Sequence, residues 1–152
     1  MPPSVRAGDV FRLAIPGDNG ETKSRFSIVL DAAPSPSNPE LVVIIFGCSR
    51  TRKGSDAERH VRVEPENRAW FNKLGLRNGT TFHLEDIRFH DAASPKLLRR
   101  LCACPPMLFL QLRKLLEKRL DEDIPIEILP RSAPSRLGPV ADAYRRESSV
   151  IE

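Results

Sequence analysis

The stretch Leu41-Val42-Val43-Ile44-Ile45-Phe46, followed by Gly47-Cys48-Ser49-Arg50, decides the fold. Its first six residues are apolar and mostly β-branched, which is typical of a central strand buried on both faces. The glycine that follows favours a bulge or a close backbone approach. No longer apolar run occurs in the sequence, and this one is far too short to cross a bilayer, so we expect no membrane span.

Shorter strand patterns lie on both sides of this stretch. In residues 10–15, Phe11, Leu13 and Ile15 share one face while Val10 and Arg12 share the other, which indicates a half-buried strand. A dense turn signal at residues 16–20 and an apolar segment at 26–30 predict a second, antiparallel strand. Further strands are predicted at residues 60–63, 80–84 and 86–89, with a short helix within 65–74.

The C-terminal third predicts a helix. After Pro105-Pro106, four leucines recur at helical spacing, with three basic residues placed outward, until about Asp121; these are Leu108, Leu112, Leu115 and Leu116, and Lys114, Lys118 and Arg119. Residues 130–152 mix Ser, Pro, Arg and Gly without periodicity and are interpreted as a disordered tail. The 152 residues therefore predict one domain, residues 1–129, with a mainly β (α+β) fold: a small, curved antiparallel barrel or half-barrel with a C-terminal helix.

The net charge and the cysteine content exclude few classes of function. The 24 Lys and Arg against 20 Asp and Glu give a net charge of +4, which permits an anionic partner without requiring one. Three cysteines, Cys48, Cys102 and Cys104, and no apolar leader at the N-terminus predict free thiols in a reducing, cytoplasmic compartment. No four ligands stand at the spacing of a zinc site, so we expect neither metal nor cofactor.

Three blocks in order resemble the PemK/MazF family, the toxins of bacterial toxin–antitoxin systems. They are Gly8-Asp9-Val10-Phe11, Lys23-Ser24-Arg25-Phe26-Ser27-Ile28-Val29-Leu30, and Val42 to Arg50. The family pattern is a G-D strand, a K-x-R-P-A-V-V-L strand and an apolar strand that ends in a small polar pair. The resemblance covers roughly residues 7–90 and implies an SH3-like barrel of PemK/MazF type.

Two positions depart from the family pattern. Phe26 stands where the family has proline. The family threonine after the apolar strand falls on Cys48 or on Ser49, depending on the register, and a slip of one residue moves a side chain to the opposite face. The register with Cys48 at this position is slightly preferred, because Gly47 and Ser49 then match as well.

The resemblance implies a metal-independent, sequence-specific endoribonuclease acting on single-stranded RNA by 2′-hydroxyl attack. Arg25 then stabilises the phosphate, and Cys48 or Ser49 positions the phosphate or the 2′-oxygen. The remaining RNA contacts are predicted at residues that bind phosphate through charge or a base through stacking: Arg50, Arg52, Lys53 and Trp70, the last together with Phe71.

The implied partners are single-stranded RNA, a cognate antitoxin and a second copy of the chain, in the bacterial cytoplasm. Each candidate also has an ordinary structural interpretation, such as a core role for Cys48 or a solvated face for the basic run. The alternative function is a catalytically inactive module that binds nucleic acid, an antitoxin-like peptide or a topoisomerase. A small binding protein unrelated to the family is a further alternative.

Overall fold

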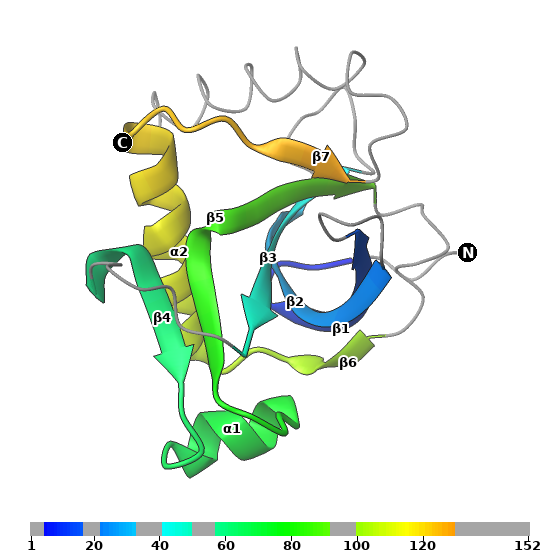
Figure 1. The fold of residues 1–152 in the computed structure, drawn as a ribbon, viewed down its shortest axis with the longest axis vertical. Coiled ribbons are helices and arrows are strands. Elements are labelled where there is room, and N and C mark those ends of the chain that lie inside the picture. Colours follow the sequence, from blue (N-terminus) through cyan, green and yellow to red (C-terminus); the bar gives the residue numbers. More distant parts are fainter. Residues whose placement is uncertain (1–4, 17–21, 33–40, 50–56, 92–99, 130–152) are drawn as a thin grey trace.

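A curled sheet of seven strands, covered by a long helix, makes up most of the computed structural model (Figure 1). The structure describes residues 5–16, 22–32, 41–49, 57–91 and 100–129. The strands are β1 (Asp9–Pro16), β2 (Thr22–Ala32), β3 (Leu41–Cys48), β4 (His60–Val63), β5 (Thr80–Asp91), β6 (Arg100–Ala103) and β7 (Glu127–Leu129). The helices are the one-turn η1 (Ala57–Arg59), α1 (Arg68–Leu74) and α2 (Pro106–Asp121).

The strand order is β4-β5-β3-β2-β1-β6, and every pair along this path is antiparallel. The last strand, β7, adds to β5 in parallel. The predicted central strand, β3, lies inside the sheet between β2 and β5. This arrangement confirms the predicted mainly β half-barrel with a C-terminal helix.

Apolar side chains gather on both faces of the sheet, because β3 alternates between them. Val43 and Ile45 point into the main core, which also receives α2, whereas Val42, Ile44 and Phe46 point into a second cluster. The second cluster consists of Phe11, Leu13, Val29, Val42, Ile44 and Phe46. The prediction of a strand buried on both faces is therefore confirmed.

The first strand is more deeply buried than predicted. Phe11 and Leu13 lie in the second cluster, as the alternation indicates, but Val10 on the other face is fully buried in the main core. Only Arg12 keeps the exposed position predicted for that face, and its guanidinium carbon lies 4.5 Å from the centre of the Phe26 ring. The half-buried interpretation of this strand was wrong at Val10, because the sheet is covered on both sides there.

Two strands predicted at residues 80–84 and 86–89 form the single strand β5. Ile45 pairs with Ile87 and Gly47 with Phe82, so residues 83–86 all lie opposite Phe46. A bulge of this size bends a strand sharply, and Figure 1 shows β5 turning at this point. We call residues 83–86 the β5 corner. It lets Phe82 and Ile87, five positions apart, both face the main core.

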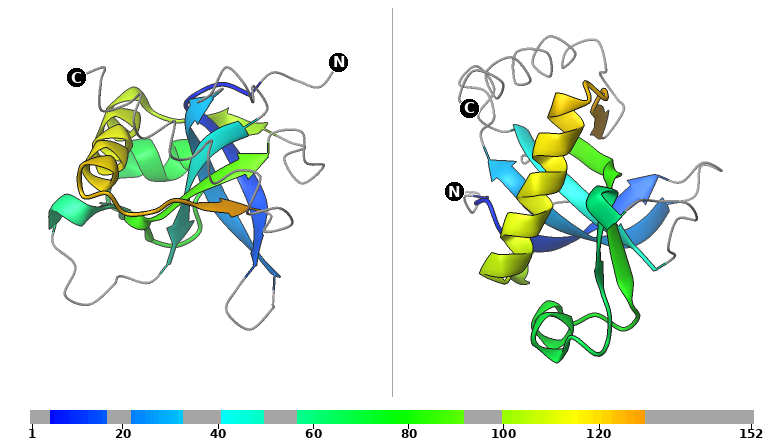
Figure 2. Two further views of the ribbon diagram at one scale, coloured as in Figure 1. Left: turned by 90° about the horizontal axis from the view of Figure 1, so that it is seen from above. Right: turned by 90° about the vertical axis from the view of Figure 1, so that its left-hand side faces the viewer.

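The helix α2 begins at Pro106, as predicted, and Figure 2 shows it lying across one side of the sheet. Its four predicted leucines are buried. The outward placement of Arg119 was wrong: it stands four residues after Leu115, on the buried face, and is only 3% exposed. Its guanidinium donates to the carbonyl oxygens of Leu84, Ile87 and Pro125.

Two short strands, β6 and β7, were not predicted. Cys102 lies in β6 and packs against the main core, and Cys104, which follows this strand, is buried in that core. None of the described helices is long and apolar enough to cross a membrane. The predicted tail, residues 130–152, lies outside the described residues.

Candidate functional site

Arg25 of β2 and Cys48 of β3 meet on the face that carries the second cluster. Ser27 pairs with Phe46, and continuing this antiparallel register by two residues sets Arg25 opposite Cys48. The Nη1 atom of Arg25 donates to the Sγ atom of Cys48 over 3.1 Å. Two residues 23 positions apart in the chain therefore form one contact, and both are half-buried.

A close backbone approach at Gly47 sets the position of Cys48. A Cβ atom at Gly47 would lie 2.4 Å from Cγ2 of Thr80 and 3.0 Å from Cε1 of Phe82. The first distance is shorter than packed side chains tolerate and the second is tight, so glycine lets β3 lie this near to β5 without a shift of Thr80. The close approach predicted from the sequence is present, and it brings Cys48 into register with Thr81.

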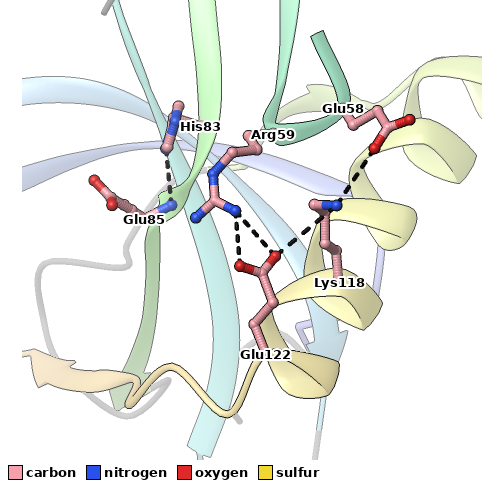
Figure 3. Close-up of polar contacts among 6 residues, drawn as sticks. All are labelled: Glu58, Arg59, His83, Glu85, Lys118 and Glu122. Carbon is pink, nitrogen blue, oxygen red and sulfur yellow. Dashed lines mark hydrogen bonds and ion pairs between the residues drawn. The ribbon is translucent and has the colours of Figure 1, made fainter. Parts of the chain in front are cut away.

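The β5 corner brings an acidic side chain to the same point. The thiol of Cys48 donates to Oδ2 of Asp86 over 3.9 Å, and Asp86 is only 3% exposed. The corner is held by its own side chains, because the amide of Glu85 donates to Nδ1 of His83 over 3.0 Å (Figure 3). Cys48 thus lies between a guanidinium from β2 and a carboxylate from β5.

The ring of Phe46 lies beneath two guanidinium groups. The Cζ atom of Arg25 lies 5.7 Å from the ring centre and that of Arg88 lies 5.4 Å from it. Both distances are within the range of cation–π attraction, which draws the two cations to one site. The Nη1 atom of Arg88 also donates to the carbonyl oxygens of Glu85 and Ile87, which fixes its position beside the corner.

This arrangement suits the binding of an anion. Within the part of the chain that the structure describes, Arg25 forms no ion pair with a carboxylate. Its planar fork is therefore able to hold two oxygens of a phosphate or carboxylate. The described residues contain no group of three His, Cys, Asp or Glu side chains that could hold a metal ion.

Of the other predicted site residues, the structure describes Ser49 and Trp70. Ser49 is exposed, and its carbonyl oxygen accepts from Nη1 of Arg62 over 3.3 Å, so the strand register gives the contact with Arg25 to Cys48 rather than to Ser49. Trp70 of α1 is half-buried against the main core, away from the second cluster. Arg50, Arg52 and Lys53 lie outside the described residues.

Sequence reasoning missed Phe46, Asp86 and Arg88 as parts of the site. Phe46 was interpreted only as part of a buried strand, and the other two as an ordinary alternating strand. The charged pair at Asp86 and Arg88, separated by one apolar residue, is the only local signal. Their approach to Cys48 depends on the β5 corner, which no local pattern predicts.

A network of ion pairs lies between η1 and α2 (Figure 3). Arg59 binds both carboxylate oxygens of Glu122, and Lys118 lies 3.5 Å from Oε2 of Glu58. The hydrogen bond from Arg59 lowers the pKa of Glu122 below its usual value. These exposed pairs fasten the end of α2 to η1 and stand apart from the contact between Arg25 and Cys48.

Comparison with known proteins supports the fold. No family model and no curated protein matches the sequence. A chain in the crystal structure of MazE-MazF (Form-III) from Deinococcus radiodurans is similar in structure, with a TM-score of 0.53 and 18% sequence identity. The match covers 77% of the present chain and 96% of that chain. The protein therefore has a MazF-like fold, as the three sequence blocks imply.

Proposed function

We propose that this protein is the toxin of a toxin–antitoxin system and cleaves single-stranded RNA without a metal ion. The observation that carries the proposal is the contact between Arg25 and Cys48. The second and third blocks of the family resemblance contribute one residue each to it. A MazF-like fold alone does not specify an activity, so the proposal depends on a guanidinium that suits phosphate at this position.

Arg25 is the residue proposed to bind the scissile phosphate. Its guanidinium carries a permanent charge and is held in place by the Cys48 thiol and the Phe46 ring. A cation fixed beforehand stabilises the extra negative charge of the transition state without reorganising during the reaction. Arg88, whose guanidinium lies 5.4 Å from the centre of the same ring, is proposed to hold a neighbouring phosphate.

The proposed reaction uses a nucleophile that RNA itself supplies. The 2′-oxygen attacks the adjacent phosphorus, the bond to the 5′-oxygen breaks, and a 2′,3′-cyclic phosphate remains. Such a reaction needs a base, an acid and a cation, but no activated water. In the proposed reaction, the Cys48 thiol, which contacts Arg25, positions the 2′-oxygen beside the phosphate bound by that arginine.

The proposed partners follow from the same fold. The similar solved structure contains MazE together with MazF, which supports a cognate antitoxin for this chain as well. A homodimer and a location in the bacterial cytoplasm complete the proposal. Trp70 and the basic run at residues 50–53 remain predicted RNA contacts.

The test is incubation of purified protein with a long single-stranded RNA in EDTA. We expect discrete fragments from the wild type and from Arg77→Ala, which removes an exposed arginine outside the site. Arg25→Ala should lower the rate at least about a hundredfold, because it removes a preorganised cation. Intact RNA with every protein, together with binding that weakens as salt rises, would favour the inactive binding module instead.

A further inference from the structure

The thiol of Cys48 has two partners of opposite charge. Nη1 of Arg25 donates to Sγ over 3.1 Å, and Sγ donates to Oδ2 of Asp86 over 3.9 Å. A thiol has a single proton, so this pair of contacts is satisfied with the proton on the side of Asp86 and a sulfur lone pair on the side of Arg25. The side chain is therefore oriented as one step of a proton path.

Asp86 places a buried carboxylate beside the proposed phosphate site. Its carboxylate is 3% exposed, and burying a charge costs free energy unless hydrogen bonds compensate. Its negative charge also repels the phosphate that Arg25 is proposed to bind. A carboxylate able to accept a proton at this point is what 2′-hydroxyl attack requires, and the contact with Cys48 places one there.

We propose that Asp86 is the positioning residue and proton acceptor through which Cys48 acts, an inference that rests on the proposed ribonuclease function. As the 2′-oxygen forms its bond to phosphorus, its proton passes to Sγ of Cys48, and the thiol proton passes to Oδ2 of Asp86. The bond from phosphorus to the 5′-oxygen breaks, and the 5′-oxygen takes a proton from water, which leaves hydroxide that is neutralised when Asp86 later returns its proton to solvent. The thiol begins and ends the step neutral, and Asp86 ends it as a neutral acid.

The separations fit a site that has not yet closed on substrate. A distance of 3.9 Å between sulfur and oxygen is long for a thiol hydrogen bond, and catalytic hydrogen bonds without substrate are often long. The β5 corner limits how far Asp86 can move, because His83 and Arg119 bind the backbone on both sides of it. Bound phosphate is therefore expected to shorten the contact by moving Cys48 rather than Asp86.

The experiment measures RNA cleavage in EDTA from about pH 5 to pH 9, with kcat and KM determined separately. The variants are Asp86→Asn, Asp86→Glu, Cys48→Ala and the double variant with Asp86→Asn and Cys48→Ala. Glu117→Gln, an exposed carboxylate on α2, is the matched control. Far-UV circular dichroism and the urea midpoint check that each variant is folded.

The charged and titratable groups around the thiol and the carboxylate could also shape the pH profile, and the variants separate their contributions. Among the described residues, β2, β5 and α2 contribute Arg25, His83, Glu85, Arg88 and Arg119. The strand β4 contributes His60, which pairs with His83, and Arg62, which donates to Ser49 and Thr81. They are unchanged in every variant. A limb of the profile that disappears only when Asp86 is replaced therefore belongs to Asp86.

We expect Asp86→Asn to lower kcat about a hundredfold with little change in KM, and to remove the fall in rate toward acid pH. Asp86→Glu should restore much of the rate. In the Cys48→Ala background, Asp86→Asn should have no further effect, because the path is already broken. Equal losses from Asp86→Asn in both backgrounds, or an unchanged pH profile, would overturn the proposal.

Two outcomes keep this proposal separate from the proposed function. If the wild type cleaves RNA in a manner that depends on Arg25 but not on Asp86, only the role of Asp86 fails. If the wild type cleaves no RNA, the ribonuclease function itself fails. Should Asp86→Asn not fold, Cys48→Ala decides alone: it must also lose the acid limb of the profile, and a retained limb would refute the proton path.

Discussion

Arg119 of α2 donates a hydrogen bond to the carbonyl oxygen of Leu84, 35 residues earlier in the chain, over 2.8 Å. The same guanidinium donates to the carbonyl oxygen of Ile87, so its two hydrogen bonds join backbone positions on either side of Asp86. The corner in turn places Asp86 beside Cys48. A buried arginine in the main core thus stabilises the backbone that forms one side of the site.

Replacing this arginine should destabilise the fold. Arg119→Met keeps the length of the side chain but leaves buried carbonyl oxygens without their donor, and we expect a loss of about 3 kcal/mol. Arg113→Met is the matched control on the same helix, because Arg113 is partly exposed and donates to the carbonyl oxygen of Leu30. The control should lose only about 1 kcal/mol. Equal losses in urea denaturation would show that the corner does not depend on Arg119.

A methyl group at Gly47 should disturb both stability and the site. Gly47→Ala forces β3 and β5 apart at Thr80, and we expect a loss of about 2 kcal/mol. Thr80→Ser removes the Cγ2 atom in the way and retains the hydroxyl bond to the carbonyl of Asn78. The double variant should therefore recover part of the loss. If Thr80→Ser gives no recovery in urea denaturation, steric exclusion at Gly47 is not the reason for glycine there.

The buried thiol of Cys104 should make stability fall at alkaline pH. Burial raises the pKa of Cys104 from 9.0 to about 12, and the nearby Cys102 adds to the effect. Because the folded pKa lies above the unfolded one, the stabilisation is complete below about pH 9 and is lost as the pH rises toward 12. The urea midpoint of the wild type should fall more between pH 8 and about pH 10.5 than that of Cys104→Ala. An equal fall in both proteins would contradict this account.

The thiol of Cys48 should be replaceable by a hydroxyl. Cys48→Thr installs the family residue at a strand position that suits β-branched side chains, and its hydroxyl can accept from Arg25 and donate to Asp86. We expect cleavage at the wild-type rate or above, whereas Cys48→Ala should lose about a hundredfold. A strong loss in Cys48→Thr, measured on the same RNA, would mean that the family threonine does not correspond to this position.

Local patterns predicted most of the elements, and long-range contacts explain the errors. The apolar run at Leu41–Cys48 and the leucine stripe of α2 carry their own signal, since each buries a face with a fixed period. The short strands β6 and β7 carry none and exist because β1 and β5 offer them an edge. The prediction for Arg119 was wrong because a charged side chain usually points to solvent, whereas here the carbonyl oxygens of the β5 corner and its neighbour Ile87 accept hydrogen bonds from it.

About half of the candidate site could be predicted from the sequence. Arg25 and Cys48 were found through blocks of sequence that resemble a family, and the antiparallel register joins them. Asp86 and Arg88 were not found, because they reach the site only through a bulge of four residues opposite Phe46. The size of this bulge depends on how β3 and β5 pack and on the hydrogen bonds from Arg119 of α2. These three elements come from separate parts of the chain, so no local pattern contains the information.

The most direct test of the central claim is the chemistry of the cleaved ends. The protein is incubated in EDTA with a single-stranded RNA, and its preferred cleavage position is then made 2′-deoxy in a second substrate. The account predicts fragments with 2′,3′-cyclic phosphate and 5′-hydroxyl ends, no cleavage at the 2′-deoxy position and no fragments with Arg25→Ala. Fragments with 5′-phosphate ends, or cleavage at the 2′-deoxy position, would contradict it.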